Sequence, residues 1–172
     1  GLVGVRSPYG ACANVYDDGG GTDTIGYGHS LQSDADRTRF APYRAGGRTF
    51  TPAQAEALLQ ADVASFSTQV ARRLTRPVPQ GVFDALVVSA FNTGAGARSL
   101  RSAVAALNAG DVQGAAQALA GGPVTSQGRP MGGLVRRRAA EAQMLLAAAG
   151  ISPSTPRSVP RSVPSSGGGD GG

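Results

Sequence analysis

The sequence predicts an α+β fold that is mostly α, with a small β-hairpin lobe and a larger helical lobe. In Asn14–Ser30, two short runs rich in Val, Tyr, Thr and Ile flank three consecutive glycines, a pattern typical of a β-hairpin. Farther along, apolar residues recur at three- and four-residue steps, which is typical of amphipathic helices. A long helix beginning at Pro52 separates the two parts, so we expect it to join the hairpin lobe to helices between Gln80 and Ala149.

Composition fits one folded domain with a tail. Residues 1–151 are long enough to bury a core, whereas 152–172 contain a doubled Arg-Ser-Val-Pro followed by Ser and Gly and should form a disordered tail or linker. The net charge of +5 favours a polyanionic partner, such as nucleic acid, anionic lipid or wall polymer. Cys12 is the single cysteine, so no internal disulfide is expected. With no membrane-length apolar run and no visible signal peptide, we expect a soluble protein.

The hairpin holds the candidate chemistry. Its strands are expected at Asn14–Asp18 and Thr22–Tyr27, with the reversal at Gly19–Gly21. Because side chains alternate along a strand, the Asp18 carboxylate and the Thr24 hydroxyl should lie close together on one exposed face, where they can hold a water molecule. The alternative is an ordinary glycine-rich hairpin whose polar residues serve only the turn.

The long helix has a clear start signal. Thr51 precedes Pro52 at the first helical position, and Gln54 completes a capping box. Its apolar stripe continues for about 22 to 25 residues, some 35 Å. Further helices are expected at Val82–Asn92 (the buried central helix), Ser99–Ala109, Asp111–Ala120 and Leu134–Ala149, with loops at Leu31–Phe50 (containing at most a short helical turn) and Gly121–Pro130.

The spacing within the hairpin is specific. The hairpin contains Tyr16, then Asp18 after one intervening residue, then Thr24 after five more, followed directly by Ile-Gly-Tyr-Gly-His. This pattern resembles the active-site hairpin of the phage-type lysozymes, the endolysins of glycoside hydrolase family 24. Three later segments resemble family segments in the family's order: Thr51–Glu56, Phe83–Leu86 with Phe91–Gly94, and Gly133–Glu141. The resemblance therefore extends over roughly residues 14–147 and strengthens the fold prediction.

The resemblance implies a function and a set of site residues. Family members hydrolyse the β-1,4 bond between N-acetylmuramic acid and N-acetylglucosamine in peptidoglycan, for bacterial lysis. Asp18 and Thr24 would be catalytic and orient the attacking water. Tyr16, Tyr27 and Gly28 would bind substrate, and His29 would be structural near the site, bracing the hairpin against the helices. Since one histidine without a second ligand makes no metal site, we predict neither a metal nor a cofactor.

The family's general acid is not visible. The family pattern places a Glu nine positions before the catalytic Asp, which is Tyr9 here, and no Glu precedes Glu56. A tyrosine hydroxyl, with an ordinary pKa of about 10, is a poor donor to a glycosidic oxygen. Either the acid lies upstream of Gly1, or the chain is a catalytically silent lysozyme-like module that binds peptidoglycan. The sequence leaves both alternatives open.

Other polar residues have simpler interpretations. Asp17 and Asp23 should point away from the Asp18 face and be solvated. Asp84 and Asn92 flank the buried helix, where polar side chains usually cap or pair. The run Arg136–Arg138 is either a solvated helix face or a polyanion contact. The expected partner is bacterial peptidoglycan, and we expect neither nucleic-acid binding nor membrane insertion. The protein should be a monomer or a domain tethered through its tail. We expect the protein to be phage-encoded, or made in a host cytoplasm and released.

Overall fold

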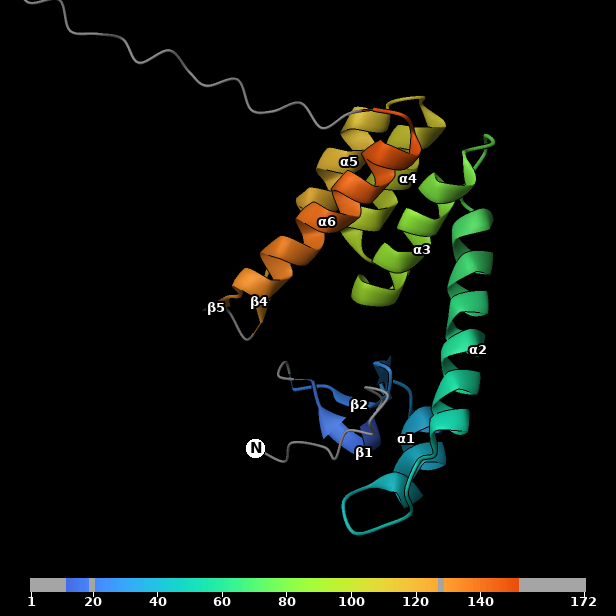
Figure 1. Cartoon of the computed structure of the whole chain (residues 1–172), viewed down its shortest axis with the longest axis vertical. Coiled ribbons are helices and arrows are strands. Elements are labelled where there is room, and N and C mark those ends of the chain that lie inside the picture. Colours follow the sequence, from blue (N-terminus) through green and yellow to red (C-terminus); the bar gives the residue numbers. More distant parts are fainter. Residues whose placement is uncertain (1–11, 19–20, 127–128, 152–172) are drawn as a thin grey trace, which may run out of the picture.

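A computed structural model describes residues 12–18, 21–126 and 129–151 (Figure 1). The predicted two-lobe, mostly helical architecture is confirmed: a small lobe with a β-sheet lies at one end of a long helix, and a bundle of helices lies at the other. The predicted disorder of 152–172 and the position of Tyr9 lie outside the described residues. None of the described helices is both long enough and apolar enough to cross a membrane.

The small lobe contains a three-stranded antiparallel sheet rather than a simple hairpin. Strands β1 (Cys12–Asp17) and β2 (Asp23–Gly26) form the predicted hairpin, and β3 (His29–Ser30) pairs with the other edge of β2. The chain reverses into β3 through Gly26 and Gly28, which have φ values of 63° and 114°. Only glycine adopts such angles at low cost, so the Gly-Tyr-Gly sequence turns the chain where the prediction ended the second strand.

The polar segment Leu31–Phe50 is more ordered than the predicted loop. It forms α1 (Asp34–Phe40), capped by the Ser33 hydroxyl, and then the 3-10 helix η1 (Ala41–Tyr43). Phe40 and Phe50 are buried, and they complete a small core with Ile25, Leu31, Ala55 and Leu58. A seven-residue helix with one buried residue has no apolar period, which is why the sequence pattern did not reveal it.

The interlobe helix α2 runs from Pro52 to Ala71 and is slightly shorter than predicted. Its predicted capping box is confirmed: the Thr51 hydroxyl accepts from the Gln54 amide, and the Gln54 side chain accepts from the Thr51 amide. Leu58 belongs to the core of the small lobe, whereas Val70 belongs to the core of the helical lobe. The helix is therefore shared by both lobes.

The helical lobe is built from the four helices that the sequence predicted. They are α3 (Gln80–Thr93), α4 (Arg98–Asn108), α5 (Val112–Ala120) and α6 (Gly132–Ala148). Helix α3 is the buried central one, as expected, with six buried side chains: Val82, Ala85, Leu86, Val87, Ser89 and Ala90. The predicted loop before α6 contains a short antiparallel pair, β4 (Thr125–Ser126) and β5 (Arg129–Pro130).

Both alternatives predicted for the arginine run of α6, a solvated face or a polyanion contact, require exposed side chains and are wrong for Arg138. Its side chain is 2% exposed and lies 3.0 Å, from Nη2 to Oε1, from Glu141, which is 3% exposed. Burial lowers the pKa of Arg138, and the neighbouring Glu141 carboxylate opposes that shift. Arg136 and Arg137 are exposed. The helix therefore turns only part of its basic run toward solvent.

Candidate active site

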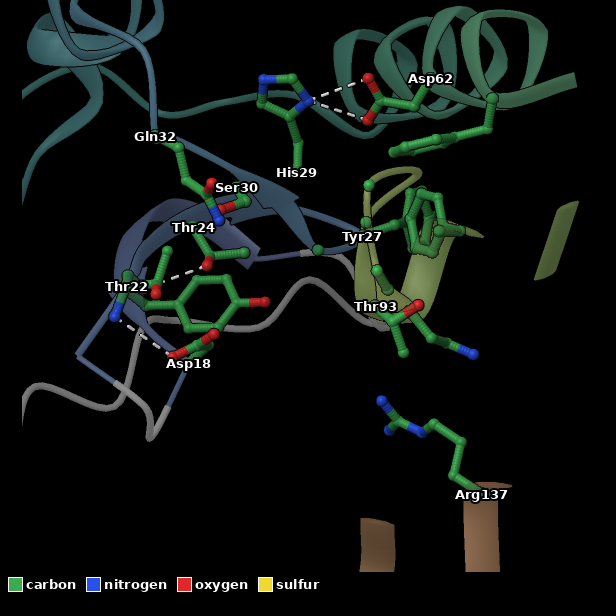
Figure 2. A pocket seen from close by; sticks show the side chains of 18 residues that line it. Asp18, Thr22, Thr24, Tyr27, His29, Ser30, Gln32, Asp62, Thr93 and Arg137 are labelled. Carbon is green, nitrogen blue, oxygen red and sulfur yellow. Dashed lines mark hydrogen bonds and ion pairs between the residues drawn. The ribbon is translucent and has the colours of Figure 1, made fainter. Parts of the chain in front are cut away.

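A cleft of about 890 Å³ lies between the two lobes. The small lobe and α2 form one wall, and the end of α3, the turn after it and α6 form the other (Figure 2). The residues that line it are Tyr16, Asp18, Thr22, Thr24, Tyr27, Gly28, His29, Ser30, Gln32, Asp62, Phe66, Phe91, Asn92, Thr93, Gly94, Gly96, Ala97 and Arg137. Every predicted catalytic and substrate-binding residue is among them.

Asp18 and Thr24 lie on the same wall, beside Thr22 (Figure 2). Asp18 directly follows β1 and is exposed, and its Oδ1 accepts a hydrogen bond of 3.3 Å from the Thr22 amide. Thr24 is cross-strand partner of Tyr16 and is only 3% exposed, so the expectation of two exposed residues is wrong for Thr24. Its hydroxyl donates to the Thr22 carbonyl at 3.2 Å. Since a hydroxyl has one hydrogen, this bond leaves Oγ1 as an acceptor toward the cleft.

The predicted substrate-binding residues surround this pair. Tyr16 comes from β1, while Tyr27 and Gly28 form the turn between β2 and β3. A β carbon at Gly28 would lie 3.7 Å from Cε1 of Phe91 on α3, and the φ of 114° would strain any other residue. Because 3.7 Å is an ordinary contact distance, the positive φ rather than a lack of space favours glycine at this position.

His29 has the contacts expected of a bracing residue. Its Nδ1 lies 2.8–2.9 Å from both carboxylate oxygens of Asp62 on α2, and its Nε2 lies 3.7 Å from Oδ1 of Asp36 on α1. The ring also packs on Phe40, with centroids 5.5 Å apart. These contacts join β3 to two helices and support the predicted structural role.

The other acidic residues of the hairpin do not line the cleft. Asp17 is exposed, and its Oδ1 accepts from the Gly21 amide at 3.2 Å. Asp23 forms an ion pair of 2.5 Å with Arg44, so the prediction that it is merely solvated is wrong. Of the described residues that line the cleft, Asp18 and Asp62 carry carboxylates. Asp62 is bound to His29, whereas Asp18 is exposed on the cleft wall beside Thr24.

The opposite wall was only partly foreseen. Asn92, expected to cap or pair, does pair, because its Nδ2 donates to Oε1 of Glu141 at 2.8 Å. Asp84 pairs in the same way, accepting from the Gln80 amide group at 2.7 Å. The turn after α3 is held by arginines from both sides, since Arg73 donates to the Ala95 carbonyl and Arg101 to the Gly96 carbonyl.

Arg137 supplies a positive charge across the cleft from Asp18 (Figure 2). It lies on α6, far along the sequence from the hairpin. The only signal in the sequence was the arginine run, which does not indicate which of its members faces the hairpin lobe.

The family follows from comparison with known proteins. The family model for phage lysozyme matches residues 8–141. The chain belongs to the phage lysozyme family. The match covers both lobes and includes the whole hairpin, the interlobe helix and most of the helical lobe.

Individual relatives of this phage lysozyme family member agree with the match. The chain is 29% identical to an endolysin of Acyrthosiphon pisum secondary endosymbiont phage 1 over 144 residues, which is 82% of this chain and 91% of the relative. It is 37% identical over 123 residues to the endolysin of Bacillus phage B103, covering 72% of this chain but only 43% of that longer protein.

Solved structures show the same fold. An endolysin from Escherichia coli O157:H7 phage FAHEc1 superposes with a TM-score of 0.60 at 33% identity, covering 78% of this chain and 82% of that one. The muramidase domain of SpmX from Asticaccaulis excentricus superposes with a TM-score of 0.55 at 28% identity, covering 83% and 88%. Family membership and these neighbours place the chain among peptidoglycan hydrolases of the glycoside hydrolase type.

Proposed function

We propose that this chain is a muramidase, which hydrolyses the β-1,4 bond between N-acetylmuramic acid and N-acetylglucosamine. The observation that carries the proposal is the position of Asp18 and Thr24 together on one wall of an interlobe cleft, with Tyr16, Tyr27 and Gly28 around them. The muramidase domain among the similar structures is consistent with this bond specificity.

The two oxygen groups suit the activation of water. The carboxylate of Asp18 is an acceptor, and the Thr24 hydroxyl is also left as an acceptor because its hydrogen is used on the Thr22 carbonyl. A water between them donates one hydrogen to each and turns a lone pair toward the anomeric carbon. Asp18 then takes the proton as the general base while the water attacks.

The reaction also needs an acid to protonate the leaving oxygen. In our leading hypothesis this acid lies upstream of Gly1, because the sequence holds no Glu before Glu56 and the position given by the family spacing is Tyr9. A carboxylic acid with a raised pKa performs this step near neutral pH, whereas a phenol is a poor donor.

The rival function is a silent module that binds peptidoglycan without cutting it. It is favoured by one specific observation. The described lining residues include two carboxylates, those of Asp18 and Asp62, and Asp62 is already bound to His29, so Asp62 is not placed to serve as the acid that hydrolysis needs. A tail from Ser152 would then act as a tether.

Analysis of the products of wall digestion tests the proposal. Purified peptidoglycan is incubated with the chain, with a version carrying the residues encoded upstream of Gly1, and with the Tyr9→Glu variant, and the soluble fragments are reduced with borohydride before mass spectrometry. A muramidase leaves N-acetylmuramitol at the reducing end, whereas a glucosaminidase leaves N-acetylglucosaminitol. Fragments of the second kind would refute the bond assignment. Retention on insoluble peptidoglycan with no fragments from any version would establish the silent module instead.

A further inference from the structure

A buried polar network lies directly behind the cleft wall. Oε1 of Glu141 accepts a hydrogen bond from Nδ2 of Asn92 at 2.8 Å and forms an ion pair with Nη2 of Arg138 at 3.0 Å. Arg138 and Glu141 are both buried on α6, whereas Asn92 sits in the last turn of α3 and lines the cleft. One carboxylate oxygen therefore joins a buried cation to a side chain in the candidate site.

This network fixes the orientation of the Asn92 amide. An ionised carboxylate only accepts hydrogen bonds, so the atom of Asn92 that faces Glu141 must be the nitrogen. The bond to Glu141 uses Nδ2, so the carbonyl Oδ1 is the second polar atom of this cleft-lining side chain. It is therefore the acceptor that Asn92 has left for a ligand, and a sugar hydroxyl or an acetamido N–H is a matching donor.

Stability does not account for the buried pair. Oε2 of Glu141, and Nε and Nη1 of Arg138, are fully buried with no hydrogen-bond partner among the described residues. A buried ion pair with such unsatisfied atoms contributes little net stability, and well-packed apolar residues of similar volume are often as stable or more so. Unlike an apolar pair, however, the Arg138–Glu141 pair fixes the orientation of the Asn92 amide.

We infer that Arg138 and Glu141 are positioning residues, which hold the Asn92 carboxamide so that its Oδ1 accepts a hydrogen bond from the glycan in the cleft. The inference rests on the proposed function, because it names a glycan as the ligand. Arg138 holds the Glu141 carboxylate in place, Glu141 orients the amide, and Asn92 contacts the sugar.

The test separates stability from affinity. All proteins carry Asp18→Asn so that the probe is not cleaved, and the probe is the peptidoglycan tetrasaccharide with two N-acetylglucosamine–N-acetylmuramic acid repeats, titrated by calorimetry. Asn92→Ala should raise the dissociation constant by about 3- to 10-fold, which is the effect expected for the loss of one hydrogen bond. The double variant R138M/E141L should melt at or above the temperature of its parent and yet lose affinity by the same factor.

The Glu141→Gln variant should behave in the opposite way. In the native network the hydrogen bond from Asn92 and the ion pair with Arg138 both involve Oε1, so the single carbonyl oxygen of Gln can take both contacts. Its affinity should stay within about twofold of the parent, while its melting temperature falls because the Arg138 charge loses its counterion. The conservative variant thus keeps the ligand contact and loses stability.

A thermodynamic cycle completes the test. The triple variant N92A/R138M/E141L should bind no more weakly than N92A alone, because all three substitutions remove one interaction with the ligand. The matched control is Asp84→Ala, which removes an exposed side-chain pair on the same helix outside the cleft and should leave affinity unchanged.

Three outcomes overturn the inference. If the parent binds the tetrasaccharide and both N92A and R138M/E141L bind equally well, the positioning role is wrong and the proposed function stands. If the affinity of R138M/E141L falls only in proportion to its melting temperature, the pair is merely structural. A parent that does not bind the tetrasaccharide at all overturns the inference and the proposed function together.

Discussion

The Asp18→Asn substitution should abolish lytic activity while leaving the fold unchanged. Asp18 is exposed, and its Oδ1 accepts a hydrogen bond from the Thr22 amide at 3.3 Å, which an Asn carbonyl oxygen can also accept. The free energy of unfolding should therefore change by no more than about 0.5 kcal/mol. Loss of the general base should lower the rate about 10²- to 10⁴-fold, equivalent to about 2.7–5.4 kcal/mol of transition-state stabilisation.

The hairpin supplies a matched control in Asp17→Asn. Asp17 is the neighbouring residue, is equally an exposed aspartate, and accepts from the Gly21 amide at 3.2 Å, but it does not line the cleft. Its substitution should change neither rate nor stability. The assay measures the initial rate of turbidity loss of a peptidoglycan suspension, and thermal melts are recorded in parallel. The substitutions are made in whichever version of the chain releases fragments in the product analysis above. If Asp18→Asn clears the suspension at the native rate, or if both variants lose activity equally, the assignment of the base is wrong.

Three further predictions concern residues around the site and in the core. Thr24→Val keeps a β-branched shape at a position that is 3% exposed but removes the hydroxyl, so the rate of clearance should fall at least about tenfold while the free energy of unfolding falls by about 1 kcal/mol. Thr24→Ala also removes buried side-chain volume, so it should lower the free energy of unfolding more than Thr24→Val does. Both variants are measured by turbidity clearance and thermal melting. His29→Ala removes the bond to Asp62 and should lower the free energy of unfolding by about 1–3 kcal/mol in a urea titration; an unchanged midpoint would contradict the bracing role. Leu86→Ala empties a fully buried position of α3 and should cost about 2–5 kcal/mol by the same titration, with a loss below 1 kcal/mol contradicting its central place in the core.

The sequence predicted those elements whose signals are local. Helix α3 could be predicted because its apolar residues form a nearly unbroken run, and α2 because Thr51 and Gln54 form a capping box. Strand β3 could not be predicted, because two residues are too few to show an alternating pattern. Its pairing with β2 also depends on the glycine turn between the two strands. Phe40 was missed for a similar reason: a single apolar residue in a polar segment does not show which core it enters.

The candidate site divides in the same way. The wall formed by Asp18, Thr24 and Tyr16 lies within a few residues of sequence, so strand alternation and the resemblance were enough to assemble it. Arg137 and Asn92 come from α6 and α3, and their placement depends on how those helices pack against each other. The burial of Arg138 could not be read from its neighbours either, since the arginines beside it are exposed.

The two separate hydrophobic cores have a consequence for cooperativity. Helix α2 contributes Leu58 to one core and Val70 to the other, and no residue between these two is buried. Among the residues that the structure describes, the small core has six buried members and the large one fifteen, so we expect the sheet and α1 to form the less stable unit. Amide hydrogens of β1, β2 and β3 should exchange with solvent through partial opening, at a lower free energy than those of α3. The hairpin that carries Asp18 and Thr24 can thus open and reclose while the helical bundle stays folded.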